Sequence, residues 1–285
     1  MRRRVVLALL LGLVWCTTAA AQQAQPITFV SDYWVRPGKE EEFLNVVNTV
    51  GGPVRDKLMA EGVVWAWGVD VPVLRMPGQP THSIWYDVGG WDGVEKVRAG
   101  IQARVNEINE QDKKAADEAK KKGQKAPKSF AERWEEIIDT GKIRDWVFRN
   151  LYAKGTSATP PAGALPYSRI FLVTVKPGKA AEWRATFDKY IKPTLDSLVD
   201  NGTINAWGLG VEEVRTDGAF THFVWVSYPN MAAMEKQRNV FVELNNKRSP
   251  EESAHINWLF TETSDAAAAR SFVLRALIFK VAPQK

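Results

Sequence analysis

Apolar positions along this chain follow two different periods, and the two periods succeed one another in the same order twice. In the first part, short apolar and β-branched runs bounded by Gly, Pro or Asp predict four strands, at 27–35, 63–73, 81–88 and 145–152. Between them, apolar residues at helical spacing predict two helices, with stripes at Phe43, Val47, Val50, Val54 and Leu58 and at Val94, Val97, Ile101 and Val105. The predicted order is strand, helix, two strands, helix, strand.

The second part repeats this order. Strands are predicted at 168–175, 204–214, 221–228 and 271–281, with one helix carrying Trp183, Phe187, Tyr190 and Leu198 and a second starting near Met231. Pro53 and Pro193 fall inside the first helix of each part, so we expect both helices to be kinked or split there. Gly62 and Gly202 are placed to end these helices in the left-handed conformation.

The two parts are related in sequence. Val35-Arg-Pro-Gly-Lys39 recurs as Val175-Lys-Pro-Gly-Lys179, and from 35 to 98 a shift of 140 residues makes 21 of 64 pairs identical without a gap. Further on the shift falls to 126, which leaves an insertion at about 112–128 in the first copy, where a solvated helical extension is expected. We therefore predict a first repeat at 22–154, a linker rich in Thr, Pro, Ala and Gly at 155–166, and a second repeat at 167–285.

The predicted order of elements is the split β-α-β motif of ferredoxin-like domains. One such sheet has helices on one face only, so its other face needs a cover, and a second copy on the same chain supplies one. The expected fold is α+β: two ferredoxin-like repeats packed sheet to sheet as an intramolecular, pseudo-dimeric α/β barrel. The order of elements and the Val-x-Pro-Gly-Lys-x-x-x-Phe/Trp segment resemble the dimeric α/β-barrel superfamily, which includes antibiotic-biosynthesis-monooxygenase-like and NIPSNAP-like domains. The resemblance covers nearly the whole mature chain and implies a fold and a pseudo-dimer, but no particular activity.

The N-terminus predicts export. Residues 1–21 combine three arginines, an apolar run and an Ala-Ala-Ala cleavage site, which is typical of a secretory signal peptide, and we expect a periplasmic or secreted protein. Cleavage after Ala21 removes three arginines and no acids, so the formal charge falls from +5 to +2 and gives little support for nucleic-acid binding. The single cysteine, Cys16, lies in this segment, so the mature chain has no thiol to bridge or to bind metal. After cleavage no membrane association is expected, whereas further assembly into homo-oligomers remains open through exposed sheet edges.

One candidate for chemistry is a motif that occurs in both copies. Arg75-x-x-Gly-x-x-Thr-His82 matches Arg215-x-x-Gly-x-x-Thr-His222 at the predicted hairpin. A His beside an Arg at the mouth of a strand could act as a general base or bind an anion. Alternatively, Thr and His hydrogen-bond the turn and fix the register of the hairpin.

Asp32 is a second candidate, because a carboxylate inside an apolar strand is unfavourable unless it is paired or exposed. The first and third strands of the split motif are antiparallel neighbours, so Asp32 and His82 are candidates for a base-orienter pair in the first copy alone. The second copy has Leu172 in place of the acid. The alternative is that Asp32 faces solvent on an edge or a loop.

Twelve tryptophans are the outlier of the composition. Aromatic side chains on the predicted strands could line a cavity for a planar or apolar ligand, although a tightly filled barrel interior is as plausible. The residues assigned to this candidate ligand site, together with the second copy of the Arg and His motif, are Trp34, Trp65, Trp67, Trp85, Tyr86, Trp207, Arg215, His222 and Trp225.

No metal site is predicted, because three histidines without ligand spacing form no ligand set. No cofactor is expected, with a haem on the helical His255 as the alternative. Three functions follow: a cofactor-independent oxygenase or isomerase using His82 with Asp32 or Arg75, a non-catalytic binder of a small apolar or aromatic molecule, and an accessory protein that docks a partner through its lysine-rich insertion.

Overall fold

The computed structural model describes residues 25–156, 165–215 and 220–282. The signal-peptide prediction, Cys16, most of the predicted linker and Gly218 lie outside these residues. The strands of the first half are β1 (Ile27–Tyr33), β2 (Val64–Pro72), β3 (His82–Val88) and β4 (Arg144–Gly155). Its helices are α1 (Glu40–Val46), the π-helix η1 (Val47–Gly51), α2 (Gly52–Ala60), α3 (Trp91–Lys121), α4 (Phe130–Ile137) and the short 3-10 helix η2 (Thr140–Lys142).

The second half repeats this order of elements. Its strands are β5 (Tyr167–Val175), β6 (Ala206–Glu212), β7 (His222–Tyr228) and β8 (Ser264–Val281). Its helices are α5 (Ala180–Tyr190), α6 (Lys192–Asp200), α7 (Met231–Asn246) and α8 (Pro250–Thr263). All strands predicted from the sequence are present, with ends that differ by a few residues except in β8, which begins seven residues earlier than expected.

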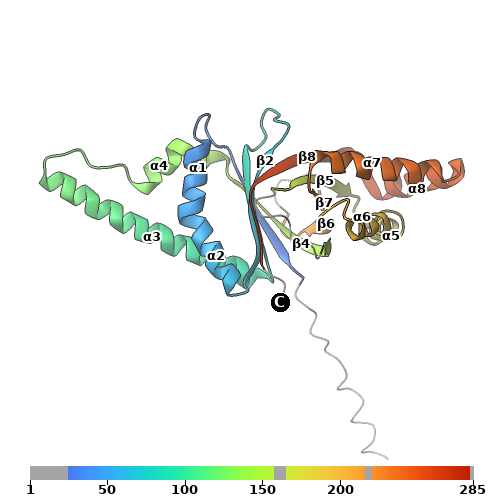
Figure 1. Cartoon of the computed structure of the whole chain (residues 1–285), viewed down its shortest axis with the longest axis horizontal. Helices are drawn as coiled ribbons and strands as arrows, with labels where there is room; N and C mark the ends of the chain where they lie inside the picture. The colour runs from blue at the N-terminus through green and yellow to red at the C-terminus, as the bar shows by residue number, and fades with distance from the viewer. Residues whose placement is uncertain (1–24, 157–164, 216–219, 283–285) are drawn as a thin grey trace, which may run out of the picture.

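The strands form one closed, antiparallel barrel with the order β1-β3-β2-β8-β5-β7-β6-β4, which confirms the predicted α+β barrel. Each half contributes four adjacent strands, and the two sets join edge to edge through β2–β8 and β4–β6. The helices of the first half lie on one side of the barrel and those of the second half on the other (Figure 1). Closure of the barrel pairs the outer strands of both halves. In the described part of the chain, the sheet therefore has no free edge through which homo-oligomers could form.

The predicted breaks in the first helices are confirmed. In the first half, α1 passes into a π-helix before α2 begins with Pro53 in its first turn. In the second half, α5 ends at Tyr190 and α6 starts with Pro193 in its first turn. Gly62 and Gly202 follow these helices with φ values of 76° and 73°, as expected for residues that end a helix in the left-handed region.

The main apolar core lies between the barrel and its helices. On β3 the residues that face the helices, His82, Ile84, Tyr86 and Val88, are buried, whereas those that alternate with them are only half-buried. One cluster packs between the first half and its helices and a second one between the second half and its own. A smaller aromatic cluster, built on Trp146, fills part of the barrel interior.

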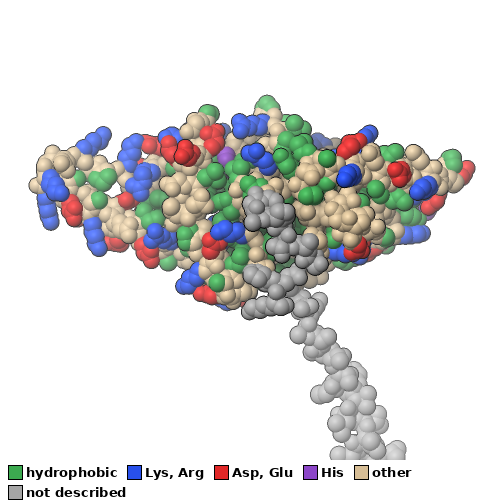
Figure 2. Space-filling model, in the orientation of Figure 1, with side chains coloured by type: hydrophobic (Ala, Val, Ile, Leu, Met, Phe, Trp, Pro, Cys, Tyr) green, Lys and Arg blue, Asp and Glu red, His purple; other side chains and the backbone are tan. Residues whose placement is uncertain are grey.

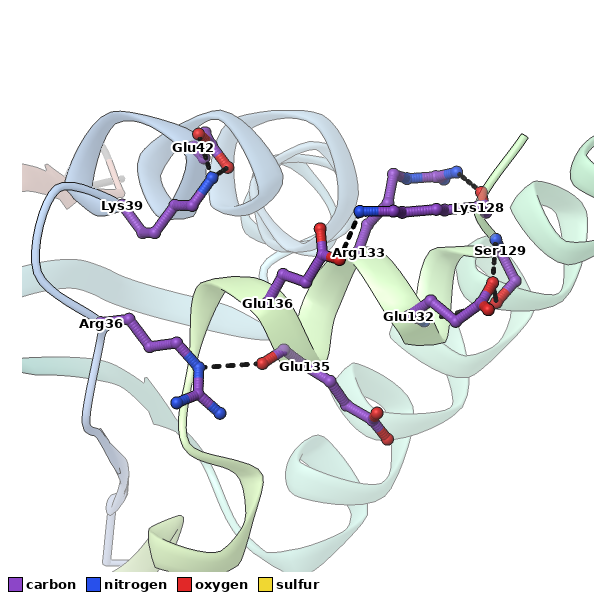
Figure 3. A network of polar contacts seen from close by, with 9 residues as sticks. All are labelled: Arg36, Lys39, Glu42, Lys128, Ser129, Glu132, Arg133, Glu135 and Glu136. Carbon is purple, nitrogen blue, oxygen red and sulfur yellow. Dashed lines mark hydrogen bonds and ion pairs between the residues drawn. The ribbon is translucent and has the colours of Figure 1, made fainter. Parts of the chain in front are cut away.

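The first half also carries a helical arm. Helix α3 spans 31 residues against 16 in α7, and its end projects beyond the body before the chain returns in α4 (Figure 1). Exposed Lys and Arg side chains gather at this end (Figure 2). Helix α4 is bonded to the segment before α1, because the Arg36 Nε donates to the Glu135 carbonyl over 3.0 Å (Figure 3). Ser129 and Glu132 form a capping box at the start of α4. Among the described residues, no helix combines the length and apolarity needed to cross a membrane.

Candidate functional site

The Thr and His side chains of the motif make the same contacts in both halves. The Thr81 hydroxyl accepts from the Val35 amide over 2.8 Å, and His82 Nδ1 lies 3.1 Å from the same oxygen. In the second half, Thr221 accepts from the Val175 amide over 2.9 Å and lies 2.9 Å from Nδ1 of the following His. These bonds tie the start of β3 to the end of β1 and the start of β7 to the end of β5, so they join two neighbouring strands rather than closing the hairpin turn that the structural alternative named.

Both histidines point away from the barrel interior. His82 packs on Phe43 with ring centroids 4.8 Å apart, and His222 packs on Trp183 at 5.0 Å. Burial lowers the pKa of each imidazole from 6.5 to about 4. Each ring is therefore neutral at physiological pH and a weak base. Arg75 and Arg215, the other members of the motif, are exposed.

The predicted pairing of Asp32 with His82 is wrong. Asp32 is opposite Ser83 in the β1–β3 register, and successive residues of a strand point to opposite faces, so His82 lies on the other side of the sheet. The expectation that Asp32 faces solvent is also wrong, because the residue is 6% exposed. It faces the interior of the barrel.

Asp32 is held there by three donors. Ser83 Oγ donates to its Oδ1 over 2.6 Å, while Trp146 Nε1 and Arg144 Nη2 donate to its Oδ2 over 2.7 and 2.9 Å. Trp34 also contacts this group, since the Arg144 guanidinium lies 5.7 Å from the centroid of its ring. A buried carboxylate with an ion pair and two further donors is fully satisfied, which explains how an acid is tolerated in an apolar strand.

A polar row continues across the inner face of the first half. The registers place Arg144 opposite Asp32, Asp32 opposite Ser83, and Ser83 opposite Asp70. Asp70 is 8% exposed, and its burial raises its pKa to about 7, only partly opposed by the indole of Trp85. At neutral pH this carboxyl group can accept or release a proton without leaving its site.

A second polar layer lies farther along the barrel. Thr28 donates to Asp87, and Asn150 donates to the Thr28 hydroxyl over 2.8 Å. Burial raises the pKa of Asp87 to about 6. The buried Asn150 Oδ1 has no hydrogen-bond partner among the described residues. The first half therefore carries polar side chains at two levels of its inner face.

An aromatic layer separates the two polar levels. Trp146 is opposite Val30, Val30 is opposite Trp85, and Trp85 is opposite Gly68. The ring of Trp85 lies so close to Gly68 that a Cβ there would come within 2.9 Å of it, so this position requires glycine. Trp85 and Val30 are half-buried, so this layer is packed less completely than the buried residues of the outer core.

The inner face of the second half has a different character. Leu172 matches Asp32, Phe223 matches Ser83, and Gly210 matches Asp70 at the shift of 140 residues. Trp225 covers Gly208 as Trp85 covers Gly68. At the level of the row in the first half, the second half therefore has no charged residue on these strands, while Ser168 and Ser227 lie at the level of Thr28 and Asp87.

The tryptophans predicted to line a ligand site are divided between two faces. Trp85 and Trp225 face the interior. Trp67 and Trp207 lie instead between sheet and helix, each 1% exposed, and donate over 3.0 Å to Asp56 and Asp196. Tyr86 stacks on Phe29 in the same outer layer, and Trp65 is 41% exposed near Gly89. Trp67, Trp207, Tyr86 and His222 therefore belong to the outer core, and the predicted single aromatic cavity is wrong for them.

The described residues offer no His, Cys, Asp or Glu cluster that could hold a metal ion. His255, the residue considered for haem, is exposed on α8 and stacks on Trp258 with ring centroids 5.9 Å apart. Its ring does not point into the barrel, so the residues around it do not fit an axial ligand of an enclosed haem.

Sequence reasoning missed Arg144, Trp146, Ser83, Asp70 and Asp87. One signal was available: Asp70 and Asp87 are acids inside apolar strands, as Asp32 is. The residues matched to Asp70, Asp87 and Asp32 in the second half are Gly, Ser and Leu. Arg144 and Trp146 had no such signal, because only the β1–β4 register brings them to Asp32.

Neither a protein-family model nor a curated protein sequence matches this chain. Several solved structures do match its fold. A candidate monooxygenase from Fusobacterium nucleatum has a TM-score of 0.58 and 12% identity over 90% of this chain and 95% of its own. A second candidate monooxygenase, from Lactobacillus acidophilus, has a TM-score of 0.54 and 11% identity over 90% of this chain and 100% of its own. An anthrone oxidase-like protein has a TM-score of 0.51 and 12% identity over 93% of this chain and 96% of its own. At these identities the likeness shows a shared barrel fold.

Proposed function

We propose that this chain is an exported barrel protein that binds a small apolar or aromatic molecule in its interior and acts on it as a cofactor-independent oxygenase or isomerase. The observation that carries the proposal is the row Arg144, Asp32, Ser83 and Asp70, which lies beside an aromatic layer on the inner face of the first half. A flat apolar molecule would pack on Trp85 and Trp225, and the row would present a base to its edge.

The proposal includes the origin of the barrel. Two ferredoxin-like repeats, at 22–154 and 167–285, would supply its halves. The order β4-β1-β3-β2 in the first half and β8-β5-β7-β6 in the second supports this view, as do the 21 identities between the copies. Residues 1–21 would direct the chain to the periplasm or the medium.

Asp70 is the proposed base. Its pKa of about 7 leaves it partly ionised at neutral pH, so it can take a proton from a weak carbon or hydroxyl acid. Asp32 is the proposed positioning residue, because its ion pair with Arg144 holds Ser83 between the two acids. His82 has no place in this scheme, since it lies on the other face of the sheet.

Anthrone is a suitable probe, both for its shape and because one solved structure of this fold is named an anthrone oxidase-like protein. In the reaction, Asp70 would take a proton from the methylene carbon, and the carbanion would reduce O2 to form a peroxide on that carbon. Loss of the second methylene proton with cleavage of the O–O bond gives the ketone. One anthrone and one O2 yield one anthraquinone and one water, with the oxygen molecule as the oxidant.

The test uses the mature chain, 22–285. Native mass spectrometry of protein purified from its own compartment detects any molecule that it carries, and quenching of tryptophan fluorescence reports binding of anthrone. Oxygen uptake then measures turnover. We expect Asp70→Asn to keep binding and to lose at least about 100-fold in turnover, with Asp87→Asn and His82→Gln within a few-fold of wild type.

The outcomes separate the alternatives. Binding without oxygen uptake by the wild-type protein would support the non-catalytic binder. Neither a carried molecule nor binding of anthrone would overturn the interior site and would leave the accessory role, in which the lysine-rich insertion docks a partner. Full turnover by Asp70→Asn would remove Asp70 from the scheme.

A further inference from the structure

A buried positive charge in the first half has no carboxylate partner. Arg55, on α2, is 6% exposed and lies in the outer layer between the helix and the sheet. Its Nε has no hydrogen-bond partner among the described residues. No ion pair of its guanidinium is found in that part of the chain either.

The nearest acid is engaged elsewhere. Asp56 follows Arg55 in sequence, but its Oδ1 accepts from Trp67 Nε1 over 3.0 Å and its Oδ2 pairs with Lys280 Nζ over 2.6 Å. The same arrangement recurs in the second half, where Asp196 accepts from Trp207 and pairs with Lys192. Asp56 is therefore part of a structural contact common to both halves; its charge acts on Arg55 and opposes the lowering of the guanidinium pKa by burial, but the described residues show no ion pair between the two.

The surroundings of Arg55 are suited to a cation. Its guanidinium carbon lies 5.5 Å from the ring centroid of Trp67 and 5.7 Å from that of Tyr86. Gly51 makes space for it, because a Cβ at this position would lie 2.5 Å from Arg55 Nη1. Gly51 is also the last residue of the π-helix η1, a distortion that is often found at functional sites.

The second half keeps the tryptophan, as Trp207, but lacks the arginine and the glycine. Leu195 stands at the position matched to Arg55 and is 2% exposed, and Ile191 stands at the position of Gly51. Tyr33 and Tyr86, the two tyrosines that lie near Arg55, are matched by Val173 and Val226. In the second half, apolar side chains fill the space between helix and sheet. The fold itself therefore does not require a guanidinium at this position.

We propose that Arg55 is the anion-binding residue of a second site, which takes a carboxylate or phosphate group between α2 and the sheet of the first half. The guanidinium offers parallel N–H donors to such a planar or tetrahedral oxyanion. Burial raises the pKa of both Tyr33 and Tyr86, so their phenols stay protonated and can donate hydrogen bonds. The site lies on the opposite face of the sheet from Asp32 and Asp70 and does not depend on the function proposed for the interior.

The test measures thermal unfolding of the mature protein at pH 7.5 and constant ionic strength, with sodium chloride replaced in steps by acetate or by phosphate. We expect one of the two anions to raise Tm along a saturable curve, by about 5 to 10 °C at a hundred times its Kd. The anion that does so identifies the source of the oxyanion. A general salt effect would instead rise without saturation and equally in every variant.

Two variants make the result specific. Arg55→Leu copies the second half, so it is expected to fold and to lose the saturable rise, whereas the exposed Arg98→Leu on α3 keeps it. Arg55→Gln serves as a second variant with a neutral polar side chain, and calorimetric titration of wild type with each anion measures binding directly. An equal response of wild type and Arg55→Leu to both anions, or no saturable response in wild type, would overturn the proposal.

Discussion

The two halves of the barrel share their scaffold and differ in the chemistry of their walls. Each half bonds a Thr before its third strand to the end of its first strand, buries a neutral His next to that Thr and anchors a buried Trp on an aspartate of the helix. On the inner face, however, the first half carries acids where the second carries Leu172, Gly210 and Ser227. Elements found in both halves therefore serve the barrel itself, and those confined to one half mark the places where a function can be sought.

The layer between the sheet and its helices also combines contacts common to both halves with groups found in the first half. The Trp–Asp contact recurs with the same 3.0 Å distance in both halves, whereas Arg55 with its glycine is confined to the first. Both faces of the sheet in the first half thus carry charged groups at positions where the second half has uncharged residues. A polar group inside a protein lowers stability unless it is paired, so stability measurements can distinguish the two halves.

The largest effect is expected from Asp70→Asn. Asp70 has a raised pKa, so its native state holds a proton between pH 3.8 and about 7 that the unfolded state releases, and wild type loses stability as the pH rises through this window. Removing the acid should raise the free energy of unfolding by up to about 4 kcal/mol at pH 7.5. Urea unfolding at that pH measures the difference, and a variant less stable than wild type would contradict the assignment.

The same variant should change the shape of the pH profile. His82 and His222 have lowered pKa values, so they add stability as the pH rises from about 4 to 6.5, while Asp70 and Asp87 remove it over nearly the same window. The two effects nearly cancel in wild type. In Asp70→Asn, stability should rise by about 1.4 kcal/mol per pH unit between pH 4 and 6.

The next effect concerns the mouth of the barrel. Asp32→Leu copies the second half but leaves Arg144, Ser83 and the Trp146 indole without their acceptor. We expect a loss of about 3 kcal/mol in the free energy of unfolding, because a buried acceptor of an ion pair is removed. Arg270→Leu is the matched control: this arginine corresponds to Arg144 but is exposed and bonds backbone carbonyls, so its removal should cost less than about 1 kcal/mol.

The smallest effect tests what the halves share. Trp67→Phe and Trp207→Phe each remove a 3.0 Å bond to an aspartate that is also paired with a lysine. Each should lower the free energy of unfolding by about 2 kcal/mol, and by the same amount in both halves. Values that differ by more than about 1 kcal/mol would show that the two contacts are not equivalent, which would weaken the use of one half as the reference for the other.

Much of the fold could be predicted because its signals are local. The strands follow from apolar runs bounded by turn residues, the breaks between α1 and α2 and between α5 and α6 follow from Pro53 and Pro193, and the helix ends follow from Gly62 and Gly202. The π-helix η1 and the full length of β8 had no such signal. The long strand exists because β8 pairs with β5 over its first part and with β2 over its last.

The sequence by itself determined the order of the elements and showed Asp32 as an acid inside an apolar strand. Only the tertiary structure decided which residues this acid meets. Asp32 and His82 lie on neighbouring strands, as predicted, but Asp32 is paired with Ser83. A difference of one residue in register places the two side chains on opposite faces of the sheet. Arg144 and Asp70 lie far from Asp32 in the sequence and share its row, because register between distant strands depends on how the whole barrel closes.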